Sequence, residues 1–185
     1  MRITKTVMAA AVAATLVSFG ANAANQGQGV VNFKGQGVVN FKGSVISAPC
    51  GIAPESADQS IDFGQISKAH LEANGISVKK NLDIKLVNCD ITELQKTGSV
   101  KVAFSGTTFG STANELGTAG NTGTAVVVSE ASGKLVSFDG TAGSATKLQA
   151  GDNTLRYSTW VKKATGGNLK EGDFTAVANF NLTYE

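Results

Sequence analysis

The chain has 185 residues, of which 42% are hydrophobic and 16% are charged, and its formal net charge is +2. This length suits one domain with one core. The apolar content and the small charge argue against a disordered chain, and the lack of a basic excess argues against a nucleic-acid binder. The two excess positive charges, Arg2 and Lys5, lie in a segment that we expect to be removed, which leaves 14 basic and 14 acidic residues.

Residues 1–23 have the pattern of a secretory signal peptide. Two positive charges precede an apolar run over residues 7–17, and Ala21-Asn22-Ala23 matches a small-x-small cleavage site. A retained anchoring helix is the alternative, but the run is short for a membrane span. We therefore expect residues 24–185 to be exported as a soluble protein.

A tandem repeat follows in residues 24–43. The first copy, residues 27–34, reads Gly-Gln-Gly-Val-Val-Asn-Phe-Lys, and the second copy, residues 35–42, is identical. Because the period is even and side chains alternate along a strand, both copies place the same residues on one face. That face carries Gly27, Gly29, Val31 and Phe33, and then Gly35, Gly37, Val39, Phe41 and Gly43. No hairpin turn supplies a partner, so the segment is either a disordered tail or a strand meant for another sheet.

The two cysteines, Cys50 and Cys89, are expected to form a disulfide in an oxidising compartment. Closing a loop of about 40 residues stabilises a fold by about 4 kcal/mol in the chain-entropy model. A metal site is the alternative, but His70 is the one histidine and there is no close cysteine pair. We expect no cofactor, no metal and no enzymatic activity, because no catalytic set accompanies His70.

Short alternating segments predict an all-β domain over residues 44–185. The strongest strand candidates are residues 81–89, 99–104, 124–128, 134–138, 153–163 and 174–184, with weaker pieces at 45–46 and 60–64. Residues 67–74 predict a short helix, and residues 105–123 predict a surface loop. Many short strands with Gly-containing turns favour a β-sandwich.

The C-terminal strand carries a continuous apolar face. Its members are Phe174, Ala176, Ala178, Phe180, Leu182 and Tyr184. An immunoglobulin-like sandwich needs about seven strands, whereas about six robust ones follow Cys50, and the chain ends without a closing strand. The N-terminal repeat is a spare strand, and the sandwich lacks a strand beside its C-terminal one. We therefore predict that the spare strand of one molecule completes the sheet of the next by strand addition. Head-to-tail repetition of this contact builds an open filament.

The sequence resembles the chaperone–usher pilins, and most closely their major rod subunits. The resemblance rests on stretches across the mature chain: 35–43 before Ala48-Pro49-Cys50, 56–65, 86–92, 123–128 and 177–184. The C-terminal pattern is the most specific, with Gly172 as the fourteenth residue from the end and Tyr184 as the penultimate one.

The resemblance implies an incomplete immunoglobulin-like β-sandwich that lacks its final strand. A periplasmic chaperone would lend a strand beside the C-terminal strand, and at an outer-membrane usher the extension of the next identical subunit would replace it. Val39 and Phe41 would then fill pockets of the neighbour's groove, and Gly37 would lie where the groove is too narrow for a side chain. The groove and chaperone contact would be formed by Gly172, Phe174, Ala176, Ala178, Phe180, Leu182 and Tyr184, and the disulfide would join the first two strands.

The expected function is that of a major structural subunit of a surface pilus rod. The alternative is a minor pilus subunit or an adhesin that binds glycans directly, but adhesins of this family have a separate lectin domain. A secreted β-sandwich enzyme is a third possibility, and one histidine argues against a metal-dependent one. The sequence favours the second copy as the donor because of its spacing to Cys50, and it leaves use of the first copy open.

Overall fold

The computed structural model describes residues 38–93 and 98–185. The expected signal peptide, the first copy of the repeat, and Gly35 and Gly37 of the second copy lie outside the described residues. The chain divides into two units, Met1–Ser44 and Val45–Glu185. In the first unit, residues 38–44 form neither helix nor strand.

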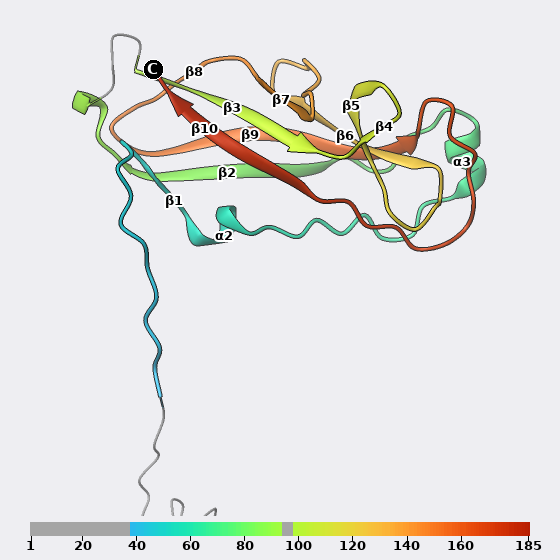
Figure 1. Ribbon diagram of the computed structural model, residues 1–185, viewed down its shortest axis with the longest axis horizontal. Helices are drawn as coiled ribbons and strands as arrows, with labels where there is room; N and C mark the ends of the chain where they lie inside the picture. The colour runs from blue at the N-terminus through green and yellow to red at the C-terminus, as the bar shows by residue number, and fades with distance from the viewer. Residues whose placement is uncertain (1–37, 94–97) are drawn as a thin grey trace, which may run out of the picture. The chain divides into compact units, whose positions relative to one another are not determined.

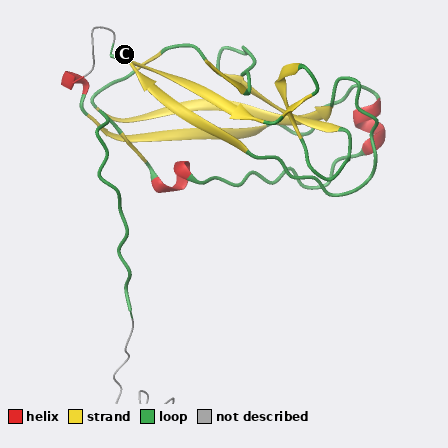
Figure 2. Cartoon of the chain, in the orientation of Figure 1, coloured by secondary structure: helices red, strands yellow, loops and turns green. Residues whose placement is uncertain are grey.

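The second unit is built from ten strands and a few short helical turns within its described residues (Figure 1). The strands are β1 (Gly51–Ile52), β2 (Lys80–Cys89), β3 (Ser99–Gly106), β4 (Thr108–Phe109), β5 (Thr112–Gly117), β6 (Thr124–Glu130), β7 (Asp139–Ala142), β8 (Thr146–Lys147), β9 (Gly151–Lys163) and β10 (Ala178–Tyr184). The helical segments are α2 (Pro54–Ala57), α3 (Lys68–Glu72) and the 3-10 turn η2 (Ile91–Glu93). Long loops join these elements (Figure 2). In the described part of the chain, no helix is long and apolar enough to cross a membrane.

Two antiparallel sheets make up this unit, which confirms the all-β prediction. One sheet has the order β1-β2-β9-β6-β5-β4, and the other has the order β10-β3-β7, with β8 also paired to β3. The two sheets share one core because their alternating apolar residues face each other. For example, the ring of Phe104 on β3 lies 5.2 Å from the ring of Tyr157 on β9.

The strongest sequence predictions hold at the centre of the sheets. In β2, Ile84 and Leu86 are fully buried while Lys85 between them is exposed. In β3, Val100, Val102 and Phe104 are buried in the same alternating way. Period-2 burial of this kind is what a strand with one face on the core requires.

Several strand and loop predictions are wrong, including one of the strongest strand candidates. Residues 45–46 and 60–64 form no strand, and residues 105–123 are not simply a loop because they contain β4 and β5. Residues 134–138 are not a strand either. The amide of Val136 bonds to the carbonyl of Val128 at 2.9 Å, but that of Phe138 bonds to the carbonyl of Ala113. The segment therefore leaves β6 after a few residues, so no continuous ladder forms.

The C-terminal strand is shorter than its sequence pattern indicates. Residues 174–177 keep the apolar alternation but are not part of β10, because Thr175 instead exchanges backbone hydrogen bonds with Ala119. From Ala178 onward, β10 follows β3 in one continuous antiparallel register, with Phe180 opposite Phe104 and Tyr184 opposite Val100.

Candidate functional site: an apolar groove along the last strand

An apolar groove of about 700 Å³ runs between two segments that are distant in sequence. One wall is formed by residues 56–63 and the other by residues 174–180. Its floor consists of core side chains, namely Leu82, Phe104, Leu116, Val126, Val128 and Phe138. The groove therefore opens the hydrophobic core itself to the surface.

One wall of this groove includes the first residues of the edge strand β10, Ala178 to Phe180. Within the described chain, β10 is hydrogen-bonded to β3 and to no other strand. Its inward-facing residues Phe180, Leu182 and Tyr184 pack against the core but are only half-buried. Partial burial of so many large apolar side chains along one strand marks a surface that another element can cover.

The Phe104 ring links this strand to the floor. It lies 6.3 Å from the Phe180 ring and 6.5 Å from the Phe138 ring, measured between centroids. Phe104 and Phe138 are buried, whereas Phe180 keeps part of its ring exposed in the groove. Tyr184 lies further along β10, and its partial burial raises the pKa of its hydroxyl.

The opposite wall is held in place by hydrogen bonds to β2. The hydroxyl of Ser56 accepts from the amide of Lys85 at 3.0 Å and donates to the carbonyl of Asp83 at 3.3 Å. The amide group of Gln59 donates to the same carbonyl at 3.0 Å. After α2, residues 59–67 form neither helix nor strand, so this wall offers β10 no strand to pair with.

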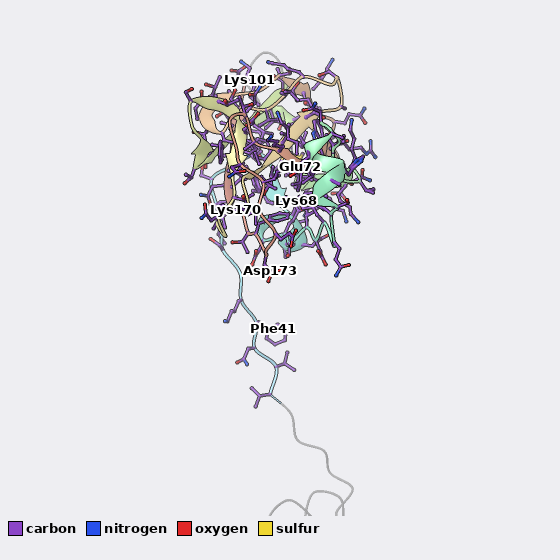
Figure 3. All side chains as sticks on the ribbon, turned by 90° about the vertical axis from the view of Figure 1, so that its right-hand side faces the viewer. Phe41, Lys68, Glu72, Lys101, Lys170 and Asp173 are labelled. Atoms are coloured by element: carbon purple, nitrogen blue, oxygen red, sulfur yellow. A yellow bond between two sulfur atoms is a disulfide. The ribbon has the colours of Figure 1, made fainter. Side chains whose placement is uncertain are left out.

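A second hollow, of about 790 Å³, adjoins the groove and shares Ile61, Phe63 and Phe174 with it. Gly172 lines this hollow and has a φ of 143°, a value that side chains disfavour. Charged residues surround it, including Lys68, Lys170 and Asp173, at the end of the unit that carries α3 (Figure 3). The groove thus runs from an apolar stretch into a more polar end.

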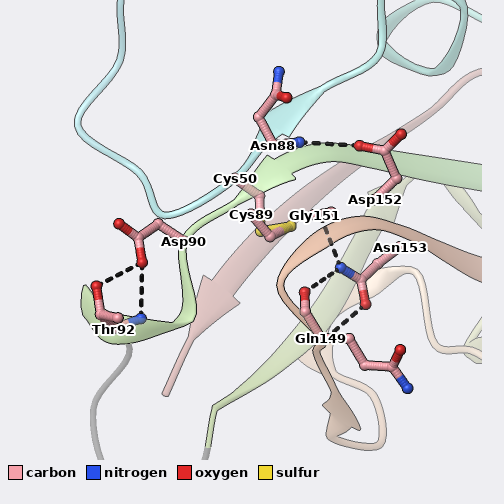
Figure 4. The surroundings of a disulfide bond; sticks show 9 residues. All are labelled: Cys50, Asn88, Cys89, Asp90, Thr92, Gln149, Gly151, Asp152 and Asn153. Carbon is pink, nitrogen blue, oxygen red and sulfur yellow. Dashed lines mark hydrogen bonds between the residues drawn. A yellow bond between two sulfur atoms is a disulfide. The ribbon is translucent and has the colours of Figure 1, made fainter.

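A disulfide joins Cys50 and Cys89, as the sequence predicts. Both cysteines are buried, and they connect the start of β1 to the end of β2 (Figure 4). Neighbouring hydrogen bonds support the same region. The Asp152 carboxylate accepts from the amide of Asn88 at 3.1 Å, and the Asp90 carboxylate accepts from Thr92. The disulfide and these hydrogen bonds therefore hold the start of β1 against the end of β2.

An ion pair between the buried Glu115 and the half-buried Lys162 fastens β5 to the end of β9. Glu115 is 3% exposed, and its carboxylate accepts from the Lys162 ammonium at 2.6 Å and from the amide of Thr165 at 2.8 Å. Burial alone would raise the pKa of Glu115, but the hydrogen bonds from Lys162 and Thr165 outweigh it and lower that pKa. The adjacent Leu116 is thereby held in the floor of the groove.

The residues expected to form the groove occupy different parts of it. Phe174 lines both hollows, and Ala176, Ala178 and Phe180 line the groove, whereas Gly172 lines only the adjoining hollow. Leu182 and Tyr184 line neither hollow and pack against the core further along β10.

Of the residues expected to donate a strand, Val39, Phe41 and Gly43 lie among the described residues. Val39 and Phe41 are 72% and 91% exposed. Gly35 and Gly37, and the whole first copy with Gly27, Gly29, Val31 and Phe33, lie outside the described residues.

The sequence analysis missed the second wall and much of the floor. Residues 56–59 carry no strand pattern, and Leu116 lies in a segment expected to be a loop. The one local signal was the apolar Leu116 beside the charged Glu115, and it is too short to predict a strand. His70 has a structural place on α3, where its Nε2 lies 3.0 Å from the carbonyl oxygen of Ile76.

Comparison with known proteins agrees with this architecture. The fimbrial protein family matches residues 39–185. The chain is 52% identical to the Pap fimbrial major pilin protein of Escherichia coli, with 98% of this chain and 99% of the relative covered. It is 38% identical to the Fimbria A protein of Serratia marcescens over the full length of both chains.

Two solved structures resemble this one. The crystal structure of the P pilus rod subunit PapA has a TM-score of 0.70 and 53% identity, covering 75% of this chain and all of that one. A subunit in the structure of a chaperone–usher pilus, described for its rod uncoiling, has a TM-score of 0.78 and 53% identity, covering 82% of this chain and 97% of that one.

These matches confirm the resemblance drawn from the sequence. They agree with a structural rather than an enzymatic role, because the family consists of subunits of the surface pilus. The chain belongs to the fimbrial protein family and is a major pilin of the chaperone–usher type, located in the surface pilus.

Proposed function

We propose that the chain polymerises by donor-strand exchange, in which the N-terminal extension of one subunit fills the groove of the next. The observation that carries this proposal is the groove along β10, whose floor is the hydrophobic core and whose strand edge has no second neighbour in the described chain. On this proposal the domain is an immunoglobulin-like sandwich without its last strand.

The N-terminal extension carries apolar side chains that match the apolar lining of the groove. In the second copy, Val39 and Phe41 fall on one strand face and are exposed in the described chain. Burying each of them in the groove contributes about 1.5–3 kcal/mol. The backbone of an added strand can also pair with the unpaired edge of β10, as in strand addition to a sheet edge.

Before assembly, the same groove needs a temporary occupant. An exposed apolar edge of this kind is a template for aggregation. A periplasmic chaperone that lends a strand beside β10 would protect it, and an outer-membrane usher would then bring in the extension of the next identical subunit. Repeated contacts of this head-to-tail type give an open filament.

We take the second copy, with Gly43 beside it, as the donor in the filament. It adjoins the folded unit, which begins at Val45. The groove binds an extension of alternating apolar residues and needs no metal or cofactor for this purpose.

The donor role is tested by removing the apolar face of both copies at once. In V31S/F33S/V39S/F41S the extension keeps its length and its glycines but loses the side chains that fill the groove. We expect this variant to be captured by the chaperone and to form no fibres visible by electron microscopy. Deleting residues 24–43 should have the same effect.

The matched control is V30S/V38S, which changes the opposite face of the same strand. Val38 is 86% exposed, and its side chain would point away from the groove if Val39 points into it. This variant should assemble normally. Fibres formed by the four-residue variant or by the deletion would disprove the donor role.

A further inference from the structure

The first strand of the folded unit stops pairing with β2 after a short stretch. β1 covers Gly51–Ile52 and is antiparallel to β2, and the amide of Ala53 still donates to the carbonyl of Lys85 at 3.0 Å. In this register an uninterrupted ladder would also join the amide of Lys85 to the carbonyl of Ala53. The next pair in the ladder would be Glu55 and Asp83. Neither of these two bonds is present in the described chain.

The short helix α2 ends the ladder. Pro54 opens this helix, and proline suits the first helical position because it has no N–H and its φ is fixed. The carbonyl of Ala53 then accepts from the amides of Ser56 and Ala57 at 2.8 and 3.1 Å, so it is no longer available to β2. The backbone groups of β2 that would have met a longer first strand therefore need other partners.

Two side chains take the place of the missing strand, and we call Ser56 and Gln59 the clip. The hydroxyl of Ser56 accepts from the amide of Lys85 at 3.0 Å and donates to the carbonyl of Asp83 at 3.3 Å. The side-chain amide of Gln59 donates to the same carbonyl at 3.0 Å. Ser56 is only 2% exposed, so the bonds of its hydroxyl are shielded from competing water. The clip thus satisfies the edge of β2 without adding a strand to it.

Because the clip satisfies β2, the chain beyond it is not drawn into that sheet. Residues 59–63 form neither helix nor strand, and they make no backbone–backbone hydrogen bond within the described chain. Most of them line the groove, across from residues 174–180. Their backbone donors and acceptors therefore remain available to an added strand, as those of a sheet edge do.

We infer that Ser56 is a positioning residue of the groove. Its hydroxyl ends the pairing of the first strand with β2 and keeps residues 59–63 as a second edge, so that an inserted strand can bond to this wall as well as to β10. This inference rests on the proposed donor-strand function. Without the hydroxyl, the amide of Lys85 loses its acceptor, and the ladder along β2 can continue toward Asp83. The wall would then move toward β2 and away from the inserted strand.

The test measures how fast the groove releases a donor peptide. The parent chain is the mature V31S/F33S/V39S/F41S subunit, whose own extension lacks the apolar side chains to compete, loaded with a fluorescent peptide of residues 35–43. Ser56→Ala should release this peptide about tenfold faster than the parent chain, because the wall loses the bonds that fix it. The amide of Lys85 should also exchange with deuterium faster in this variant, which reports on the clip itself.

Ser77→Ala is the matched control. Ser77 is 7% exposed, and its hydroxyl accepts from the amide of Val161 at 2.9 Å and donates to the carbonyl of Val78 at 3.2 Å, but it lines neither hollow. This control should lower the urea midpoint of the peptide complex about as much as Ser56→Ala does and leave the rate of peptide release unchanged.

A second variant keeps the test decisive if Ser56→Ala yields no folded complex. Gln59 is exposed, and Gln59→Glu keeps the shape of the side chain but cannot donate to the carbonyl of Asp83. It should also accelerate release, and release at the parental rate would then overturn the inference.

Two further outcomes would overturn the positioning role, namely release from Ser56→Ala at the parental rate, or an equal acceleration in Ser77→Ala. Failure of the donor proposal has a different signature. In that case the parent chain would hold a peptide that carries V39S/F41S as tightly as the unchanged peptide of residues 35–43.

Discussion

The rings of Phe104 and Phe180 lie 6.3 Å apart, one on the buried strand β3 and the other on the edge strand β10. Phe104 belongs to the closed core, and Phe180 is where that core meets the groove. The two residues are directly paired in the ladder, so whatever fills the groove contacts the same aromatic cluster that stabilises the sandwich. On the donor-strand proposal, filling the groove therefore also completes the core.

Phe180→Lys should prevent capture by the chaperone. The substitution removes a ring from the core edge, a loss of about 3–5 kcal/mol for Phe→Ala, and adds a charge that the groove cannot solvate. We expect the subunit to disappear from the periplasm, as measured by immunoblotting of periplasmic extracts. Asn181→Lys is the matched control because Asn181 is exposed on the other face of β10. Equal accumulation of the two variants would contradict the assignment of the groove.

The Glu115 carboxylate should make stability depend on pH. Its pKa is lowered in the fold from the ordinary value of 4.5, so its contribution is present above about pH 4.5 and is lost as the pH falls through the lowered value. Glu115→Gln should cost about 1–3 kcal/mol at pH 7 and little at a pH below both values. Urea unfolding of the subunit, with its groove filled by a peptide of residues 35–43, measures this. A penalty that stays the same at both pH values would contradict the ionic role.

The disulfide should stabilise the folded unit by constraining the unfolded chain. Cys50 and Cys89 are 39 residues apart, and a loop of this length corresponds to about 4 kcal/mol. C50S/C89S should therefore unfold at a much lower urea concentration than the oxidised wild type in the same peptide complex. The wild type reduced with dithiothreitol serves as the control, since it lacks the bond but keeps both residues. Coincident unfolding curves for the oxidised wild type and C50S/C89S would exclude this contribution.

Substitutions at two glycines should distinguish the free-energy cost of a strained backbone from the cost of a steric clash. Gly123 and Gly166 have φ of 70° and 76°, but a Cβ at Gly123 would lie 2.6 Å from the carbonyl carbon of Asn168, whereas a Cβ at Gly166 would meet nothing within 4 Å. Gly166→Ala should cost about 1–2 kcal/mol from the left-handed backbone alone. Gly123→Ala should cost about 1–3 kcal/mol more, because the backbone of Asn168 must shift. Urea unfolding of both variants measures the difference, and equal losses would show that the contact at Asn168 relaxes freely.

The sequence alone was enough to predict the central strands, the disulfide and the apolar face of the last strand. In β2 and β3 the alternation of apolar and polar residues is long and regular, and such alternation is a local property of the chain. The two cysteines could be paired from their number and the expected export. The even period of the tandem repeat likewise follows directly from the printed residues.

Only the tertiary structure showed where the groove lies and what forms it. Residues 56–59 have no periodic pattern, and they become part of a wall because Ser56 and Gln59 bond to Asp83 of β2. Residues 174–177 do have the pattern, yet they leave the ladder because Thr175 pairs with Ala119. Both outcomes depend on contacts between residues far apart in the chain, and local periodicity carries no information about such contacts.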